Sequence, residues 1–267
     1  MSERSNDSEV MRLSGDQVEL VRDRVAVEAP LELRLGARPF TVLMRTPGDD
    51  EDLARGFLFT EGLIARADDI AGLSRPEGLS GDEVGNVLAV ELRPGLVPPP
   101  YERVFYSSSS CGVCGKASIA QLAVHAAPIE SRLTVKHRVL SALPEKLRAT
   151  QRVFAETGGL HAAALFSPDG RLTAAREDVG RHNAVDKLAG WALAAGRLPL
   201  AEQVMLVSGR IGYEIVQKAL VAGVPIIAAV GAPSSLALEL AAQFGLTLVG
   251  FLRDDAMNVY TVNQRIV

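Results

Sequence analysis

Residues 204–252, VMLVSGRIGYEIVQKALVAGVPIIAAVGAPSSLALELAAQFGLTLVGFL, contain three short apolar runs separated by two segments of helical composition. The runs Val204–Val207, Val224–Val230 and Leu246–Leu252 have the length and the aliphatic content of buried strands. Strands that are joined through helices form right-handed crossovers, so this stretch predicts a parallel sheet within an α/β domain. The two helices are predicted over Ile211–Ala222 and Leu236–Phe244.

Two loops follow strands of this predicted sheet, and each leads into a helix. Ligands of open α/β sheets gather beyond the carboxyl ends of the strands, and amides at a helix start favour phosphate groups. An ordinary capped turn explains either loop alone, and neither loop matches a P-loop or a GxGxxG fingerprint. The two loops together favour a phosphorylated ligand. The candidate binding residues here are Ser208, Gly209, Arg210, Gly231 and Ser234.

The first hundred residues have a different pattern. Residues 1–24 are polar and are predicted to be a disordered tail. Alternating apolar residues before and after Gly36–Pro39 predict a β-hairpin, and acids between Thr46 and Asp52 begin a helix that ends near Gly62. Val87–Leu92 is a further predicted strand.

Consecutive prolines at 98–100 indicate a stiff linker. The predicted organisation is therefore an N-terminal α+β subdomain over residues 25–100 and a larger α/β domain over residues 101–267. In the larger domain, further predicted elements precede the sheet described above. They are helices over Ala117–Ala126 and Pro144–Glu156, a hairpin of His161–Phe166 with Arg171–Arg176, and a helix from its cap Asn183 to about Ala195.

Composition excludes several classes of protein. The chain has 267 residues and a formal net charge of −4, which gives no sign of general nucleic-acid binding. No signal peptide and no apolar run long enough to cross a bilayer is present, so we expect a cytoplasmic protein with no membrane contact. Thiols stay reduced in that compartment, which favours working cysteines over a structural disulfide.

Both cysteines of the chain lie in the segment SSSSCGVCGK, residues 107–116, as Cys111 and Cys114. Small residues leave the backbone few constraints, while Lys116 and the predicted helix behind it would lower a thiol pKa. Three chemistries compete for this pair: carriage of a sulfane sulfur as a persulfide, dithiol redox cycling, and zinc binding. Zinc would need His161 with His182, or His125 with His137, and neither pair has finger-like spacing, so we expect no metal site.

A dense polar segment, REDVGRHNAVDK, covers residues 176–187 and opens a predicted helix. A solvated loop with a helix cap explains it as well as a functional site does. The functional interpretation is a polar wall for a large ligand with many hydrogen-bonding groups. Its candidate binding residues are Arg181, His182 and Asn183.

These motifs together resemble the FdhD family of formate dehydrogenase accessory proteins, from about residue 25 to the C-terminus. The motifs are CGVCGK (111–116), GGLHAA (158–163), the polar segment 176–187, SGR (208–210) and GAPSS (231–235), with RTPGDD (45–50) and GFLR (250–253) in support. Several separated motifs in the right order are far more specific than a single CxxC.

The resemblance implies a sulfurtransferase that takes persulfide sulfur from a cysteine desulfurase. The acceptor would be the molybdenum cofactor in its bis-molybdopterin guanine dinucleotide form, which a guanine nucleotide could mimic. Formate dehydrogenase would be the enzyme that requires this cofactor. Cys111 would carry the persulfide and Cys114 would assist. The family's cofactor contact maps to Phe251, Leu252, Arg253, Asp254, Asp255 and Ala256.

The resemblance also implies a homodimer and a cytidine-deaminase-like three-layer core in the larger domain. Deamination itself is disfavoured, because no glutamate lies two residues after His161 to act as general acid and base. Two alternatives remain: a non-enzymatic chaperone that binds the molybdenum cofactor, and a dithiol redox protein.

Overall fold

The structure, a computed structural model, describes residues 4–97 and 126–267. Its largest sheet has six strands in the order β12-β11-β10-β9-β7-β8. The predicted parallel arrangement of β9, β10 and β11 is confirmed, but β7, β8 and β12 run antiparallel to their neighbours, so the sheet is mixed. The strands are β7 (His161–Phe166), β8 (Leu172–Asp178), β9 (Val204–Val207), β10 (Ile226–Ala229), β11 (Thr247–Arg253) and β12 (Ala256–Val259).

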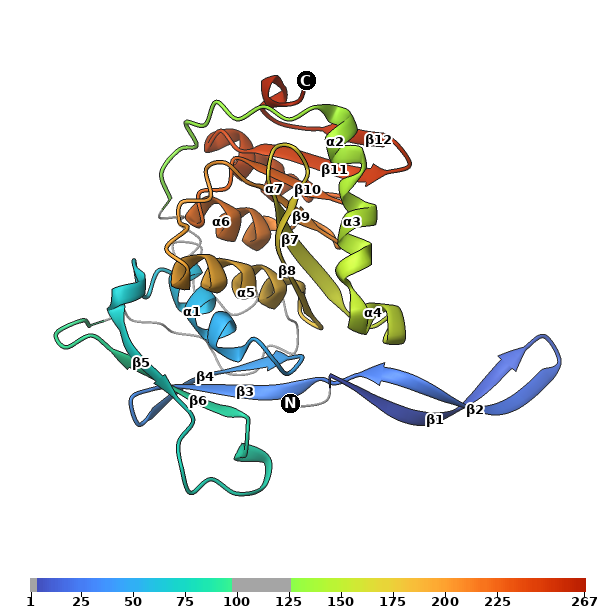
Figure 1. Ribbon diagram of the computed structural model, residues 1–267, viewed down its shortest axis with the longest axis vertical. Coiled ribbons are helices and arrows are strands. Elements are labelled where there is room, and N and C mark those ends of the chain that lie inside the picture. The colour runs from blue at the N-terminus through green and yellow to red at the C-terminus, as the bar shows by residue number, and fades with distance from the viewer. Residues whose placement is uncertain (1–3, 98–125) are drawn as a thin grey trace.

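Helices cover both faces of this sheet and make three layers (Figure 1). One face packs against α5 (Arg181–Ala194), α6 (Tyr213–Val221) and α7 (Ser235–Gln243). The other face packs against α2 (His137–Ser141) and α3 (Leu143–Thr150), which α4 (Arg152–Thr157) follows. The layering agrees with the expected architecture, while the likeness of this core to cytidine deaminases stays a prediction.

The single helix predicted over Pro144–Glu156 is wrong, because the chain breaks it at Gln151. This residue has ψ of 73°, outside the helical region. The first turn of α4 has its own hydrogen-bond acceptor, because the Glu177 carboxylate accepts hydrogen bonds from the amides of Val153 (3.2 Å) and Phe154 (2.9 Å). A carboxylate at the first turn of a helix satisfies amides that have no partner within the helix.

A second, four-stranded sheet in the order β4-β3-β6-β5 lies beside the first unit and packs on α1 (Asp50–Thr60). The predicted hairpin, helix and third strand are confirmed, whereas β5 was not predicted because it is short and carries a glycine. The strands are β3 (Ala29–Leu35), β4 (Arg38–Arg45), β5 (Ile70–Ser74) and β6 (Val87–Leu92).

Helix α1 crosses α5 at backbone-to-backbone distance, and two glycines make this possible. A Cβ atom built on Gly56 would lie 1.7 Å from the carbonyl oxygen of Asp186, and one on Gly190 would lie 1.8 Å from that of Asp52. Only glycine avoids these overlaps. The close crossing fixes the position of the four-stranded sheet relative to the six-stranded one.

Disorder was predicted for residues 1–24, and for residues 4–24, which the structure describes, this prediction is wrong. The chain forms β1 (Ser5–Ser14) and β2 (Gln17–Ala26), an antiparallel ribbon that extends away from the body (Figure 1). Gly15, with φ of 60°, supplies the left-handed residue that a two-residue turn requires. The ribbon escaped prediction because little of it is buried, so its alternation of apolar and polar residues is weak.

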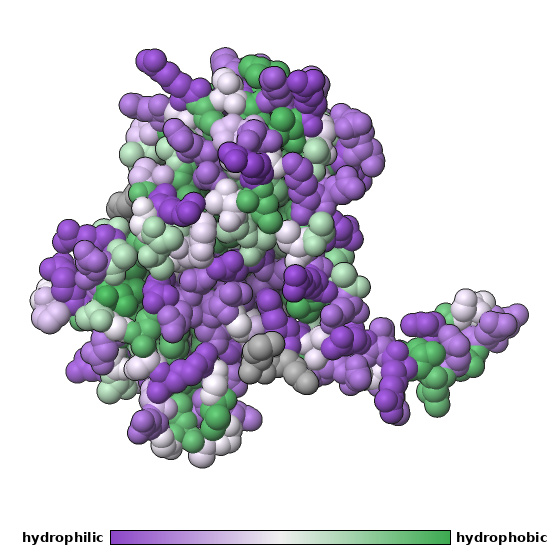
Figure 2. Space-filling model, in the orientation of Figure 1, coloured by the Kyte–Doolittle hydropathy of each residue, from purple (hydrophilic) through white to green (hydrophobic). Residues whose placement is uncertain are grey.

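The base of the ribbon is tied to α4, and its tip is apolar. Arg24 forms an ion pair with Glu156 at 2.8 Å. Figure 2 shows a hydrophobic patch on the projecting end of the ribbon. The cross-strand register places its exposed members on one face of the ribbon: Met11, Leu13, Val18 and Leu20.

The helix crossing leads to a stability prediction. Gly190→Ala places a methyl group against the Asp52 carbonyl and should cost about 3 kcal/mol of unfolding free energy, measured by urea denaturation. Gly72→Ala is the matched control, because the added methyl meets only one atom, at 3.9 Å, and should change stability little. Equal stabilities of the two variants would contradict the close crossing.

Candidate functional site

The predicted loops and the start of the polar helix lie at one edge of the six-stranded sheet. Parallel strands β9, β10 and β11 end at this edge. Strand β7 runs the other way and begins there, and β8 ends there, because His161 pairs with Asp178. The edge therefore collects residues from five strand ends and from the first turn of α5.

Backbone hydrogen bonds hold the loops to one another. The Gly231 amide donates to the Gly209 carbonyl (3.3 Å), and the Phe251 amide donates to the Gly231 carbonyl (3.1 Å). A Cβ atom on Gly231 would lie 2.9 Å from the Gly209 oxygen, so glycine is required for this approach. The Ser234 amide likewise donates to the Ile211 carbonyl at 3.0 Å.

These bonds change the chemistry expected of the loops. Several amides that we expected to be available to a phosphate are bonded within the protein. The hydroxyls are used as well: Ser208 Oγ accepts a hydrogen bond from the Ala162 amide (2.9 Å), and Ser234 Oγ caps α7 by accepting one from the Ala237 amide (3.3 Å). These amides and hydroxyls are engaged within the protein, so other side chains of this edge become the candidates for contact with a ligand.

Phe251 is one such side chain. Its φ of 53° is left-handed, which is rare for an aromatic residue, and its side chain is 38% exposed. The strain accompanies an irregularity in β11 between Gly250 and Arg253. Leu252, the next residue, is fully buried in the core between the sheet and α2–α3, so its side chain is not accessible to a ligand.

Asp254 and Asp255, the two acids that follow Phe251 in the predicted cofactor contact, form a turn. Arg253 pairs with Ala256, and the two residues between them, Asp254 and Asp255, have φ of 49° and 60°. Two consecutive left-handed residues form the tight turn of a hairpin, and aspartate tolerates this conformation better than most residues. Arg253, Asp254, Asp255 and Ala256 are all exposed.

The polar segment 176–187 serves mainly as scaffold. His182 Nε2 lies 3.1 Å from Glu214 on α6, and both side chains are buried. Asn183 was expected to cap α5, but the cap is Gly180, and Asn183 donates to the Met44 carbonyl (2.7 Å) and to Asp178 (2.9 Å). Of the three candidates in this segment, only Arg181 makes no such side-chain contact with the residues that the structure describes.

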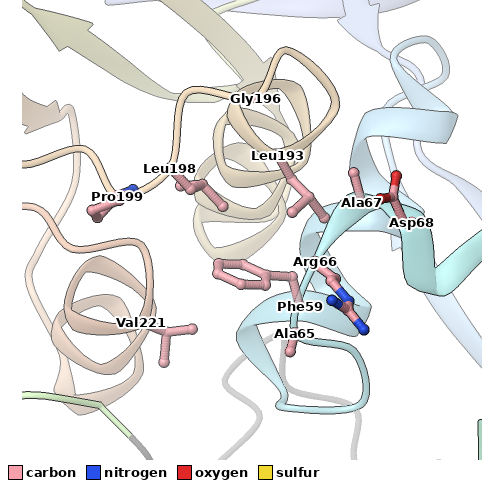
Figure 3. A pocket seen from close by; sticks show the side chains of 10 residues that line it. All are labelled: Phe59, Ala65, Arg66, Ala67, Asp68, Leu193, Gly196, Leu198, Pro199 and Val221. Carbon is pink, nitrogen blue, oxygen red and sulfur yellow. The ribbon is translucent and has the colours of Figure 1, made fainter.

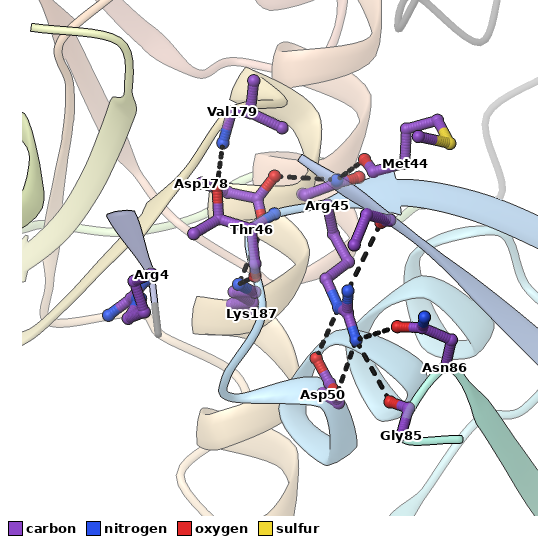
Figure 4. A network of polar contacts seen from close by, with 12 residues as sticks. Arg4, Met44, Arg45, Thr46, Asp50, Gly85, Asn86, Asp178, Val179 and Lys187 are labelled. Atoms are coloured by element: carbon purple, nitrogen blue, oxygen red, sulfur yellow. Dashed lines mark hydrogen bonds and ion pairs between the residues drawn. The ribbon is translucent and has the colours of Figure 1, made fainter. Parts of the chain in front are cut away.

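Asp178 is the centre of a buried network that joins the two sheets (Figure 4). Its carboxylate accepts hydrogen bonds from the amides of Gly180 (2.8 Å) and Thr46 (3.2 Å) and forms a 2.8 Å ion pair with Lys187. Lys187 also donates to the Thr46 carbonyl at 3.0 Å. Both charged side chains are fully buried, so each depends on the other.

Arg45 anchors the same network from β4 (Figure 4). It makes a two-pronged ion pair with Asp50, at 2.9 and 3.1 Å, and reaches Asn86 at 3.2 Å. Arg75 also binds Asp50. These guanidinium groups lower the pKa of the Asp50 carboxyl and outweigh its burial, which alone would raise the pKa.

His161 belongs to the edge, although sequence reasoning considered it only as a zinc ligand and as part of a family motif. A Cβ atom on Gly209 would lie 3.2 Å from the imidazole Nδ1, so the ring lies against this glycine. Burial first, and then the charges of Arg181 and Arg210, lower the pKa of His161 below its ordinary value of 6.5.

A separate pocket of about 490 Å³ lies at the opposite end of α5 from Arg181. Figure 3 shows Phe59 and Leu193 facing this space, with Arg66 and Asp68 on the segment beside it. None of the predicted site residues that the structure describes lines it. The lining residues are Phe59, Ala65, Arg66, Ala67, Asp68, Leu193, Gly196, Leu198, Pro199 and Val221.

Cys111 and Cys114, the predicted cysteine site, lie outside the described residues. The helix predicted at 117–126 also lies outside them, except for its last residue. Within residues 4–97 and 126–267, no three histidine, cysteine or acidic side chains gather as a metal site would require. None of the helices in those two ranges has both the length and the apolar character needed to cross a membrane.

Comparison with known proteins gives a consistent family. The FdhD/NarQ family model matches residues 26–267. The chain is 53% identical to "Sulfur carrier protein FdhD" of Mycobacterium bovis over 266 residues, covering 96% of each chain. It is 50% identical to the protein of that name from Streptomyces avermitilis, covering 96% of this chain and 94% of that one.

A solved structure from Desulfotalea psychrophila, described as a formate dehydrogenase accessory protein, has the same fold. It superimposes with a TM-score of 0.79 at 26% sequence identity, covering 99% of this chain and all of that one. From the family match and the identities over nearly full length, we conclude that this chain belongs to the FdhD/NarQ family.

Proposed function

We propose that this protein is a cytoplasmic sulfurtransferase that receives persulfide sulfur from a cysteine desulfurase and passes it to the molybdenum cofactor needed by formate dehydrogenase. Cys111 is the proposed carrier and Cys114 its assistant. The names of the relatives support sulfur carriage, and the family resemblance supports the donor, the acceptor and a homodimer.

The side chains at the edge of the six-stranded sheet support the proposed acceptor. After burial, the charges of Arg181 and Arg210 lower the pKa of His161, and exposed Phe251 lies near the end of β11. Cations bind phosphate oxygens, and an aromatic face stacks on a nucleotide base. A guanine dinucleotide form of the cofactor offers both groups, so this edge is the proposed docking site.

A cofactor-binding chaperone without sulfur transfer is the second candidate, because the same edge would serve it equally well. Incubation with a cysteine desulfurase and cysteine, followed by intact-mass measurement, separates the two. A carrier gains about 32 Da, one sulfur atom, and loses it on reduction. Repeated absence of this species favours the chaperone.

The carrier proposal predicts that Cys111→Ala abolishes maturation of formate dehydrogenase in cells while leaving the thermal unfolding midpoint unchanged. The reason is chemical: without the thiol no persulfide forms at this position. Formate dehydrogenase activity in a strain that relies on the variant is the measurement. Full activity with Cys111→Ala would refute the proposed carrier.

The docking proposal predicts that Phe251→Ala weakens binding of a guanine nucleotide by about five- to hundredfold, the range for loss of one stacking contact. Calorimetry with guanosine diphosphate gives the affinity. Leu172→Ala is the matched control, because Leu172 is 44% exposed but lies at the start of β8, on the far edge of the sheet. Similar losses in both variants would argue against stacking at Phe251.

A further inference from the structure

Arg181 and Arg210 bring two positive charges to the sheet edge. The buried acids nearby are paired with other residues, Asp178 with Lys187 and Glu214 with His182, while Asp254 and Asp255 lie exposed in the turn after β11. Among the residues that the structure describes, no carboxylate lies within ion-pair distance of Arg181 or Arg210. Each of these arginines can therefore form a charge-assisted hydrogen bond with an anionic ligand.

His161 lies between the segments that carry Arg210 and Arg181. Its ring rests on Gly209, directly before Arg210, and its strand partner Asp178 stands three residues before Arg181. The Ser208 hydroxyl and amide both bond the backbone of Ala162, which fixes the start of β7 beside the loop. His161 is only partly buried.

The charged groups that act on His161 come from three elements: Arg181 from α5, Arg210 from the loop after β9, and Asp178 from β8. Burial is the largest of the causes that disfavour a proton on the imidazole, and the two arginines add to it, while Asp178 favours the proton. An anion that neutralises the arginines removes the main electrostatic opposition to a proton on His161.

We infer that Arg181, Arg210 and His161 together hold a phosphate group of the ligand, and that His161 takes up a proton from solvent as the phosphate binds. The proton returns to solvent when the ligand leaves, so no other reactant is involved. This inference rests on the proposed function, because it assigns the phosphate-binding part of the same site. His161 acts as a binding residue whose charge adapts to the ligand.

The affinity for the phosphate ligand should therefore depend on pH. The pKa of His161 is below 6.5 in the free protein and rises in the complex, so affinity increases as pH falls through this range. Each unit by which the pKa rises is worth up to about tenfold in affinity. A phosphate ligand also titrates near neutral pH, so the contribution of His161 must be measured against a variant that cannot be protonated.

The test is calorimetric titration of the full chain with guanosine diphosphate between about pH 5.5 and 8, in buffers of different ionisation enthalpy. We expect wild type to take up more protons than His161→Gln, and its affinity to rise more steeply at low pH. Inorganic pyrophosphate should show the same difference, because the proposed contact is with phosphate.

A second readout needs no ligand. Proton NMR of the imidazole C–H signals, assigned with His161→Gln, gives the pKa of His161 in the free protein. Arg210→Gln and Arg181→Gln should each raise it towards 6.5. Arg171→Gln is the control, because Arg171 lies at the far edge of the sheet and pairs with Asp169, and it should leave the pKa unchanged.

Two results would overturn the inference. One is an unchanged His161 pKa in both edge-arginine variants. The other is guanosine diphosphate and pyrophosphate binding that is absent, or that has the same pH dependence in wild type and His161→Gln. Neither result alters the mass measurement of persulfide on the cysteines, so failure of this inference and failure of sulfur carriage are distinguishable.

Discussion

The buried ion pair between Asp178 and Lys187 is the interaction on which the rest of the structure depends. It joins the end of β8, the first turns of α5 and the segment between β4 and α1 in a single network. Removing one partner of a buried pair leaves an uncompensated charge and typically costs about 3–5 kcal/mol. The candidate site is held in place by this network, because Arg181 follows Asp178 by three residues and His161 is the strand partner of Asp178.

Close backbone approach recurs in two places, and glycine permits both. Gly56 and Gly190 let α1 settle on α5, while Gly231 lets its loop rest on that of Gly209. The first contact positions the two sheets, and the second aligns the loops at the edge where we propose that the ligand binds. In both, the substitution of any larger residue would separate segments whose spacing the site requires.

The parallel strands could be predicted from sequence because each is a short apolar run between helix signals, and topology then located the loops at one edge. The roles of individual residues could not be predicted in the same way. His182 and Asn183 have the polarity of ligand-binding groups, yet their partners Glu214 and Met44 lie 32 and 139 residues away along the chain. Only the folded chain shows that these two side chains are already engaged.

The β1–β2 ribbon has a geometric consequence for the molecule. Ten extended residues span roughly 33 Å, and the ribbon is anchored at its base, where Arg4 bonds the Glu177 carbonyl next to the end of β8. The apolar tip of the ribbon therefore projects away from the body of the molecule. A partner bound only at the tip would lie about one ribbon length from the base of the ribbon and the end of β8.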